Sequence, residues 1–294
     1  MKYIPIKDAP PALLELLTDG HPSIPTRYGV TSLIGAPMQR QLLIRHYNNL
    51  VVDPLDNMFM LFGRLLHEKL EKKAGQNALT EERLTLPLPD GKCIVGIPDY
   101  YDEADGGTIW DYKFCSTFAG KDDEVKPEWV QQLNIYAYLL KKCAGFDAKH
   151  LKIAMIFRDW SAAKARTQTD YPPKFKVVSV GVYPLSTMET FINYSLAEHA
   201  RAEKMTDDEL ATLMPCTDDE RWMSEQVFAV MKDGAKKATK LFVDKSIAES
   251  HAEELGKAYA VVERPKVYRK CEEYCNLRQV CPIMMAKKDP TTNW

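Results

Sequence analysis

The sequence of 294 residues lacks the features that direct a chain into a membrane or out of the cell. It has no run of about eighteen apolar residues, so no transmembrane helix is expected. Its first residues, MKYIPIKDAPPALLELL, contain acids and prolines but no apolar signal core, which argues against secretion. We therefore predict a cytoplasmic protein that makes no membrane contact.

An excess of basic charge is also missing. The 39 Lys and Arg residues are balanced by 41 Asp and Glu residues, and the formal net charge is −2. The chain as a whole therefore has no electrostatic attraction for nucleic acid, and any contact with a phosphate backbone would have to use a local basic patch. No P-loop sequence is present, so a motor activity would need a partner.

Cysteine is too sparse to indicate a disulfide framework, with seven in the whole chain and no secretory signal. Cys271, Cys275 and Cys281 are nevertheless closely spaced in a polar segment, a pattern typical of metal ligands in intracellular proteins. A tetrahedral zinc site or a four-cysteine iron–sulfur cluster needs a fourth ligand. Cys216, in the polar segment MPCTDDERW, is the best remaining candidate; unrelated thiols are the alternative.

The most informative stretch that is present is GIPDYYDEADGGTIWDYK, residues 96–113. It predicts two strands joined by a tight turn, because its second half alternates as a half-buried strand does and ADGG is a turn signal. If the turn centres on Asp105, Asp99 lies opposite Asp111. Because strand side chains alternate, Lys113 then shares a face with Asp111.

Two carboxylates that face each other destabilise a pair of strands unless something offsets their charge. A divalent cation would do so, and hard oxygen ligands suit Mg²⁺ or Mn²⁺. Such a cation lowers the pKa of a bound water and polarises a phosphoryl oxygen, while Lys113 could orient the nucleophile or steady developing charge. The motif therefore indicates metal-dependent phosphoryl chemistry; a solvated hairpin with ordinary surface charges is the alternative.

Helices and strands are expected on both sides of this hairpin, which predicts an α/β fold. We predict helices over 57–74, 127–144 and from residue 186, and strands over 82–89, 91–99, 151–160 and 174–183. A small β-β-α-β unit is expected between Cys216 and Cys271. Its lysines could contact a phosphate backbone or form a solvated hairpin.

Two features near the start of the chain suggest specific roles. The segment from Thr31 has helical spacing and a positive side made by Arg40, Arg45 and His46, which could meet a phosphate backbone or be a solvated face. Gly63 stands in the middle of a predicted helix, where glycine costs about 1 kcal/mol relative to alanine. Close packing is the expected reason for it.

Four short motifs follow one another between about residues 30 and 200. They are Gly63-x-x-x-His67, Pro98-Asp99, Asp111-x-Lys113 and Gln132-x-x-x-Tyr136. In this order and spacing they resemble the RecB-like branch of the PD-(D/E)XK nuclease superfamily. The resemblance implies a restriction-endonuclease-like core, a mixed β-sheet flanked by helices, over 31–210, with a lead-in over 1–30 and a C-terminal cysteine-cluster subdomain over 211–294.

The resemblance also assigns roles to the motif positions. The implied metal ligands are His67, Asp99, Asp111 and the backbone carbonyl of Tyr112. The implied catalytic lysine is Lys113, and the residues implied to support the site and touch the nucleic-acid backbone are Gln132 and Tyr136. Reasoning from the residues alone singles out Asp99, Asp111 and Lys113, but not His67 or Gln132.

Nucleases of this branch close their fold with a [4Fe-4S] cluster held by three C-terminal cysteines and one earlier cysteine. This sequence departs from that pattern, because Ala36 occupies the early position and the first C-terminal spacing is one residue longer than the usual C-x2-C. The segments PCTDDERW and CEEYC also look similar to phage-type nucleases. The resemblance therefore implies a cluster on Cys216, Cys271, Cys275 and Cys281, with Zn²⁺ as the alternative metal.

We predict a Mg²⁺- or Mn²⁺-dependent exonuclease that hydrolyses phosphodiester bonds at single- or double-stranded DNA ends during DNA processing or recombination. A recombinase, a single-strand-binding protein or a helicase could be its partner, and it could form a homo-oligomer. If the chain is of phage origin, its location is the cytoplasm of a bacterial host. The alternatives are a non-cleaving DNA-end-binding module and a CRISPR-adaptation trimming nuclease; the missing early cysteine disfavours the second.

Overall fold

The computed structural model describes residues 1–7, 9–20, 23–72, 78–80, 82–120 and 125–287. The chain divides into two units, Met1–Leu210 and Ala211–Trp294, and each is described by itself. Among the described residues, no helix combines the length and the apolar character needed to cross a membrane. The domain bounds given above stay a prediction.

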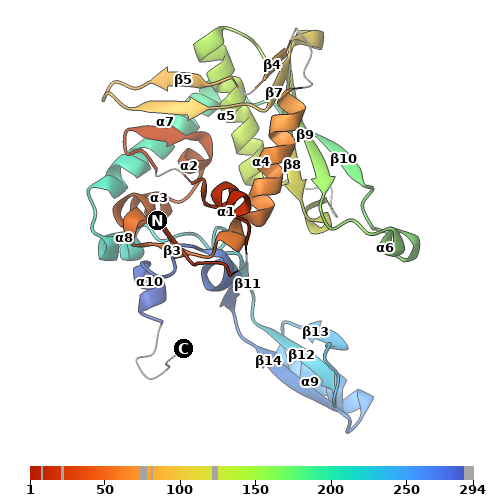
Figure 1. The fold of residues 1–294 in the computed structure, drawn as a ribbon. Helices are drawn as coiled ribbons and strands as arrows, with labels where there is room; N and C mark the ends of the chain where they lie inside the picture. Colours follow the sequence, from red (N-terminus) through yellow and green to blue (C-terminus); the bar gives the residue numbers. More distant parts are fainter. Residues whose placement is uncertain (8, 21–22, 73–77, 81, 121–124, 288–294) are drawn as a thin grey trace. The chain divides into compact units, whose positions relative to one another are not determined.

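The centre of the first unit is a five-stranded sheet with strand order β10-β9-β8-β7-β4 (Figure 1). Its strands are β4 (Ala78–Thr80), β7 (Tyr100–Asp102), β8 (Thr108–Cys115), β9 (His150–Phe157) and β10 (Phe175–Val180). The sheet is mixed, because β8 pairs in parallel with β9 and antiparallel with β7. The predicted mixed α/β fold is therefore confirmed.

Two smaller sheets complete the strands of this unit. They comprise β2 (Arg27–Gly29), β6 (Cys93–Gly96) and β5 (Leu84–Pro87) in one sheet, and β1 (Lys2–Tyr3) paired with β3 (Val51–Val52) in the other. β5 and β6 form the antiparallel hairpin expected from the sequence, but each strand is shorter than predicted.

The helices of the first unit pack on both sides of the sheets. They are α1 (Pro11–Thr18), α2 (Val30–Ile34), α3 (Pro37–His46), α4 (Met58–Glu71), α5 (Pro127–Ala144), α6 (Ala162–Thr167) and α7 (Leu185–Glu203), followed by α8 (Asp207–Leu213), which crosses the division between the units. The last two residues predicted for the helix over 57–74 lie outside the described residues. α5 starts with a proline and ends at Gly145, whose φ is 80°, as its sequence predicts.

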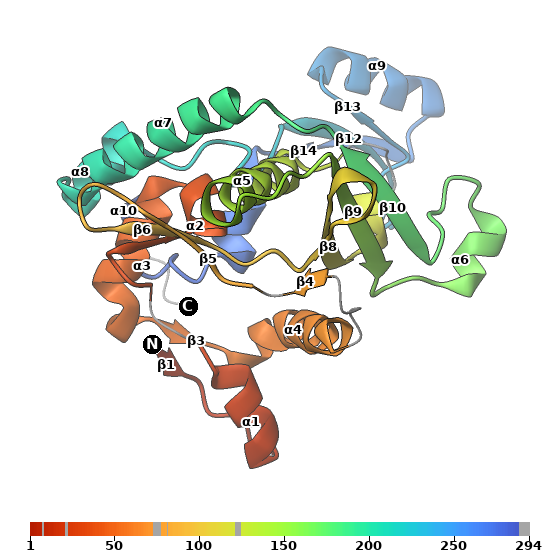
Figure 2. The same cartoon turned by 90° about the horizontal axis from the view of Figure 1, so that it is seen from above.

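Helices α4 and α5 contact opposite faces of β8 (Figure 2). Phe114 meets Phe62 of α4 with ring centroids 6.5 Å apart, whereas the preceding residue, Lys113, contacts Gln132 of α5. Because successive strand residues point to opposite faces, the two helices lie on the two sides of the strand. α5 supplies much of the core through Leu133, Ile135 and Leu139, all of which are fully buried.

The single helix expected from Thr31 is wrong, because the structure has two helices there. α2 ends at Ile34, and α3 starts at Pro37. Ala36 between them has an extended conformation with a ψ of 128°, since a residue before proline avoids the helical region.

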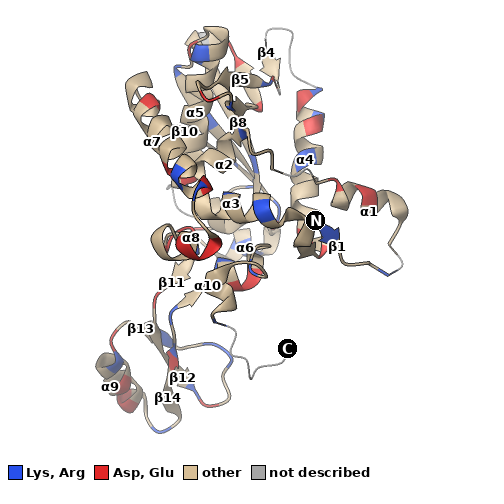
Figure 3. Ribbon diagram, turned by 90° about the vertical axis from the view of Figure 1, so that its left-hand side faces the viewer, with Lys and Arg blue, Asp and Glu red and all other residues tan. Residues whose placement is uncertain are grey.

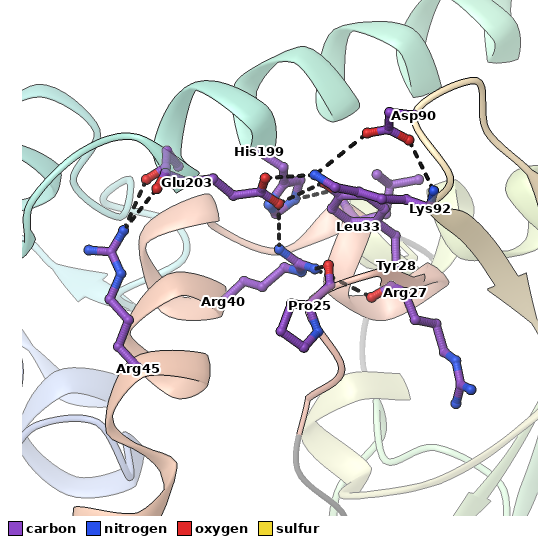
Figure 4. A network of polar contacts seen from close by, with 11 residues as sticks. Pro25, Arg27, Tyr28, Leu33, Arg40, Arg45, Asp90, Lys92, His199 and Glu203 are labelled. Carbon is purple, nitrogen blue, oxygen red and sulfur yellow. Dashed lines mark hydrogen bonds and ion pairs between the residues drawn. The ribbon is translucent and has the colours of Figure 1, made fainter.

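The predicted positive face of α3 is also wrong at Arg40. This residue is only 4% exposed, and its guanidinium lies 4.2 Å over the ring of Tyr28. It donates to the carbonyl of Pro25 over 2.7 Å and contacts Glu203 over 3.3 Å (Figure 4). Its charge is therefore used inside the protein and is not presented to a ligand.

Glu203, near the end of α7, is the centre of this cluster. Its carboxylate accepts hydrogen bonds from the Tyr28 hydroxyl over 2.9 Å and from the Lys92 ammonium over 2.6 Å. We call Tyr28, Arg40, Lys92 and Glu203 the Glu203 network. It ties β2, α3, the start of β6 and α7 together.

The other two residues of the predicted face also have an acidic partner. Arg45 and His46, at the basic end of α3, contact Asp207 over 2.7 and 2.6 Å. In Figure 3 the acidic residues of α8 are red. Asp207 begins the acidic first turn of α8, where negative charge suits the helix dipole. The end of α3 is therefore an ion-paired contact within the first unit.

The second unit contains the β-β-α-β arrangement expected from its sequence. Its elements are β11 (Met223–Ser224), β12 (Val227–Lys232), β13 (Lys240–Phe242), α9 (Lys245–Leu255), β14 (Tyr259–Arg264), β15 (Val267–Tyr268), a π-helix over Lys270–Tyr274 and α10 (Pro282–Met285). Strand β12 lies between β13 and β14, and one face of this sheet packs its apolar side chains against α9.

Candidate active site

The candidate site lies where strands β7 and β8 separate. Their antiparallel ladder ends at the pair Tyr100 and Trp110, which is the register predicted from a turn at Asp105. Asp99 immediately precedes the ladder and Asp111 immediately follows it. The turn uses Gly107 at a φ of 94°, where a side chain would collide with neighbouring backbone.

At this fork the backbone groups of Tyr112 contact side chains instead of a neighbouring strand. Continuing the register would place Pro98 opposite Tyr112, but proline has no N–H to donate to the carbonyl of Tyr112. The Tyr112 N–H instead donates to the carboxylate of Asp99 over 2.7 Å. Its carbonyl oxygen lies 3.1 Å from Nε2 of His67. The fork therefore aims a carbonyl and a carboxylate at the same region.

His67 reaches this region from helix α4. Its Nδ1 atom is 3.3 Å from Oδ1 of Asp99, and its ring meets the ring of Tyr112 edge-on at 6.2 Å. The His67 side chain is partly exposed, whereas that of Asp99 is only 10% exposed. The helix thus brings an imidazole to the open edge of β8, 45 residues away in sequence.

Lys113 lies on the other side of the same strand, facing α5. Its ammonium is 2.7 Å from Oδ2 of Asp111, and it donates to Oε1 of Gln132 over 2.9 Å. The amide nitrogen of Gln132 in turn donates to the hydroxyl of Tyr136 over 3.0 Å. Since Gln132 and Tyr136 are four residues apart on one helix face, α5 holds Lys113 through a chain of two hydrogen bonds.

Asp111 is the most constrained charge in this group. It is 1% exposed, and among the described residues neither of its carboxylate oxygens has a well-directed hydrogen bond, so its contact with Lys113 is an ion pair only. Burial raises the pKa of Asp111 to about 6, the nearby charge of Lys113 opposes this rise, and the charge of Asp99 adds to it. A buried carboxylate without hydrogen bonds is unfavourable unless a cation or a proton satisfies it.

The potential ligand atoms at the fork suit a hard divalent cation. The carboxylates of Asp111 and Asp99, the carbonyl of Tyr112 and the imidazole of His67 are ligand types that suit Mg²⁺ or Mn²⁺. As they stand, no three His, Cys, Asp or Glu side chains of the described ranges are arranged to hold a metal ion. Instead, His67 contacts Asp99, and Lys113 contacts Asp111.

The structure thus brings together every residue predicted for the active site, although their roles stay a prediction. Sequence analysis did not single out Trp129, whose ring lies 5.7 Å from the Lys113 ammonium and 5.2 Å from that of Lys126. Its position three residues before Gln132 on one helix was the available signal. An aromatic ring and a second cation therefore accompany the lysine.

The predicted cysteine site lies wholly in the second unit. All seven cysteines are described and none is in a disulfide. Cys271 lies in the π-helix, Cys275 follows it, and Cys281 precedes α10. Burial raises the pKa of the Cys275 thiol, and the neighbouring Cys271 and Cys281 thiols raise it further, so these three side chains lie near one another.

The segment after Cys216 lies beside the segment that leads into Cys271. Strands β11 and β15 pair, and the Lys270 N–H donates to the carbonyl of Arg221 over 3.2 Å. The ring of Trp222 also packs against that of Tyr274 at 5.3 Å. These contacts draw two distant stretches together, but the described thiols are not arranged as a metal site.

A family model describes the chain over most of its length. The model of the PD-(D/E)XK nuclease superfamily matches residues 35–282, a range that includes the four motifs and the three C-terminal cysteines. The chain belongs to the PD-(D/E)XK nuclease superfamily. Its membership of the RecB-like branch and its phage type stay predictions.

Two solved structures are similar to parts of this nuclease-superfamily chain at low sequence identity. The crystal structure of SSO0001 is 18% identical, with a TM-score of 0.41 over 63% of this chain and 84% of that one. The alkaline exonuclease LHK-Exo from Laribacter hongkongensis is 12% identical, with a TM-score of 0.39 over 64% of this chain and 95% of that one. No curated protein matches the sequence.

Proposed function

We propose that this protein is a metal-dependent deoxyribonuclease that hydrolyses phosphodiester bonds from DNA ends. The observation that carries the proposal is the state of Asp111, a buried carboxylate near Asp99 that has the Lys113 ammonium 2.7 Å away but no well-directed hydrogen bond from any described residue. A structural carboxylate would have its hydrogen bonds satisfied within the fold. This one is left for a ligand, at the position where the superfamily places its motif.

In the proposed mechanism, the side chains of His67, Asp99 and Asp111 and the carbonyl of Tyr112 hold Mg²⁺ or Mn²⁺. When bound, such a cation polarises the scissile phosphate and makes an attacking water more acidic. Lys113 is held by Asp111 and Gln132 with its ammonium beside the two carboxylates, where it can orient the water or donate to a phosphoryl oxygen.

Tyr136 keeps that lysine in place indirectly. Its hydroxyl accepts from the amide nitrogen of Gln132, which leaves the amide oxygen facing Lys113. The wrong amide orientation would present two N–H donors to an ammonium. Tyr136 and Gln132 are therefore positioning residues in this proposal.

Superfamily membership and the RecB-like motif pattern support DNA ends as the proposed substrate. They also support a proposed role in DNA processing or recombination, with a recombinase, a single-strand-binding protein or a helicase as the partner. The cytoplasm, of a bacterial host if the chain is of phage origin, stays the proposed location.

For the second unit we propose a cluster held by Cys216, Cys271, Cys275 and Cys281, a [4Fe-4S] cluster in the first instance and Zn²⁺ as the alternative. The proposal is supported by the approach of the three C-terminal thiols and by the pairing of the segment after Cys216 with the segment before Cys271. Soft thiolate ligands suit both metals.

Metal analysis of anaerobically purified protein tests the cluster. We expect visible absorbance and about four irons per chain, both lost in Cys275→Ser and kept in Cys143→Ser, which changes an exposed cysteine of the first unit. Colourless protein with one zinc would replace the cluster by a zinc site. Protein without either metal would overturn the proposal.

Cleavage of end-labelled DNA tests the nuclease. Single-stranded and duplex substrates are incubated with Mg²⁺, Mn²⁺ or EDTA, and we expect metal-dependent release of end label by the wild type. Asp99→Ala and Lys113→Ala should abolish it, whereas Lys142→Ala, at a partly exposed lysine of α5, should not. Folded protein that binds DNA but never cleaves it would indicate a non-cleaving end-binding module instead.

A further inference from the structure

A cleft of about 470 Å³ runs along the exposed side of α4 and shares His67 with the candidate active site. At one end it is lined by Phe59, Met60 and Phe114. At the other end it is lined by two glutamates, Glu68 and Glu71. Arg64 also lines the cleft, so one side of His67 is apolar with a single cation and the other side is acidic.

The apolar end exposes large apolar side chains to solvent. Phe59 is 54% exposed and Met60 57% exposed, although both lie on a helix with a buried side. Phe114 comes directly after Lys113 on β8. Large exposed apolar side chains that cluster beside a site mark a surface for a ligand.

A positive charge accompanies these rings. The guanidinium of Arg158 lies 4.1 Å over the ring of Phe59. The backbone N–H of Arg158 donates to the backbone carbonyl of Cys115 over 3.0 Å. Arg158 is exposed and lies just past the end of β9, next to the end of β8. Aromatic faces next to a cation are the combination that binds unpaired bases together with their phosphates.

Gly63 lies between the apolar end and His67, and it is unexplained by packing. A Cβ atom added there would meet no atom within 4 Å, so the expected close-packing reason for this glycine is wrong. Glycine within a helix is unfavourable relative to alanine. Since Gly63 lines the cleft, its missing side chain leaves room there for a ligand.

We propose that this cleft binds the unpaired bases of a single-stranded DNA end, stacked against Phe59 and Phe114 with Arg158 near a backbone phosphate. The strand then passes over Gly63 toward His67 and the carboxylates. In a blunt duplex only the outer face of the terminal base pair is free, and paired bases cannot separate to meet two different rings. The site therefore selects single-stranded ends over blunt duplex ends. This inference rests on the proposed nuclease function.

Stacking is measured directly with an oligonucleotide that carries 2-aminopurine at its terminal position, in EDTA so that no cleavage occurs. Stacking on an aromatic ring quenches 2-aminopurine, and we expect quenching by the wild type. Phe59→Leu keeps the apolar volume but removes the ring, so it should lose the quenching and bind about 5- to 100-fold more weakly. Phe59→Trp should restore both, and Tyr194→Ala, at an exposed aromatic of α7, should change neither.

Gly63 gives a second test in which stability and binding move in opposite directions. Gly63→Ala and Gly63→Leu place good helix formers at an open position, so both variants should unfold at a higher temperature than the wild type. Both should bind the single-stranded oligonucleotide more weakly, Leu more than Ala, because their side chains fill the cleft. Weaker binding by a more stable protein cannot be attributed to misfolding.

Cleavage then tests the selection of single-stranded ends. The ratio of cleavage rates on single-stranded and blunt duplex DNA should fall at least about fivefold in Phe59→Leu. The cleft is not a base-binding site if quenching and binding are the same in the wild type, Phe59→Leu and Gly63→Leu. That result would leave a protein partner as the occupant of the cleft. Phe59-dependent quenching by a wild type that cleaves no DNA would instead support the cleft and reject the nuclease.

Discussion

Two groups of charged residues inside the first unit place a carboxylate in opposite surroundings. In the Glu203 network the carboxylate receives hydrogen bonds from Tyr28 and Lys92 and an ion pair from Arg40. In the candidate active site the carboxylate of Asp111 has an ion pair with Lys113 at 2.7 Å but no well-directed hydrogen bond from any described residue. One carboxylate is fully partnered by the fold and the other is not.

The pKa values of these two carboxylates are shifted in opposite directions. Burial alone would raise the pKa of Glu203, but the hydrogen bonds from Lys92 and Tyr28 outweigh it and hold this pKa below its ordinary value. At Asp111, burial prevails over the attraction of Lys113 and raises the pKa to about 6. The same chain therefore stabilises the negative charge of the partly exposed Glu203 and destabilises that of the buried Asp111.

This difference separates a structural cluster from a functional one. A charge that is partly withdrawn from water is stabilised where ion pairs and hydrogen bonds surround it, as around Glu203. An unsatisfied buried group is unfavourable and is kept where a ligand or a reaction uses it. The following predictions each change one cluster and measure both stability and activity.

The largest expected effect is the loss of cleavage in Asp111→Asn. This variant removes a proposed ligand and the charge that holds Lys113, so we expect the cleavage rate to fall by about 10³-fold or more. Its melting temperature should not fall, because a buried charge without hydrogen bonds disappears. End-label release and thermal unfolding measure the two quantities, with Asp147→Asn as an exposed control. More than a tenth of wild-type activity in Asp111→Asn would contradict the site.

The next largest effect is a pH dependence of stability in EDTA. Because the folded-state pKa of Asp111 is about 6 and its ordinary value is 3.8, the folded protein holds an extra proton between these pH values. Stability contributed by that proton is lost as pH rises from about 4 to 6, by on the order of 3 kcal/mol. Urea unfolding across this range should show the fall in the wild type and not in Asp111→Asn. A flat wild-type profile would mean that Asp111 is already satisfied.

Glu203 should produce the opposite pH dependence. Its lowered pKa means that its contribution is present above about pH 4.5 and is lost as pH falls through the folded-state pKa. Glu203→Gln should lower the free energy of unfolding at pH 7 by about 1–3 kcal/mol, because Lys92 and Arg40 lose the negative charge and one of the two acceptor oxygens. Cleavage per folded molecule should stay within about twofold of the wild type. Glu189→Gln removes an exposed ion pair on the same helix and should cost less than about 1 kcal/mol.

The sequence alone was sufficient for the hairpin, because local chemistry determines it. The glycines of the ADGG turn set the register, and the register sets the positions of Asp99, Asp111 and Lys113 relative to one another. The fold class followed from the order of helices and strands for the same reason.

Interactions between distant parts of the chain were not predictable from spacing or periodicity. Arg40 has the sequence context of a surface cation, but Glu203, 163 residues later, draws it into the interior. His67 entered through the family resemblance alone, since nothing local shows that its helix reaches the backbone of Tyr112. Gly63 was assigned to packing, whereas its surroundings are open. Only the three-dimensional arrangement distinguishes a missing side chain that allows packing from one that leaves a cleft.

The smallest expected effect concerns Tyr136. This residue combines features of the two clusters, because it is buried and hydrogen-bonded within the fold, like the Glu203 network, yet belongs to the candidate active site. Tyr136→Phe removes the hydroxyl that accepts from Gln132, while the ion pair between Lys113 and Asp111 remains. Losing one hydrogen bond of about 1 kcal/mol that positions the lysine should lower the cleavage rate about fivefold, in kcat rather than KM. Gln132→Leu should have a larger effect, and adding Tyr136→Phe to it should change little further, because the hydroxyl acts through the amide. Additive losses in the double variant would mean that Tyr136 contacts DNA directly.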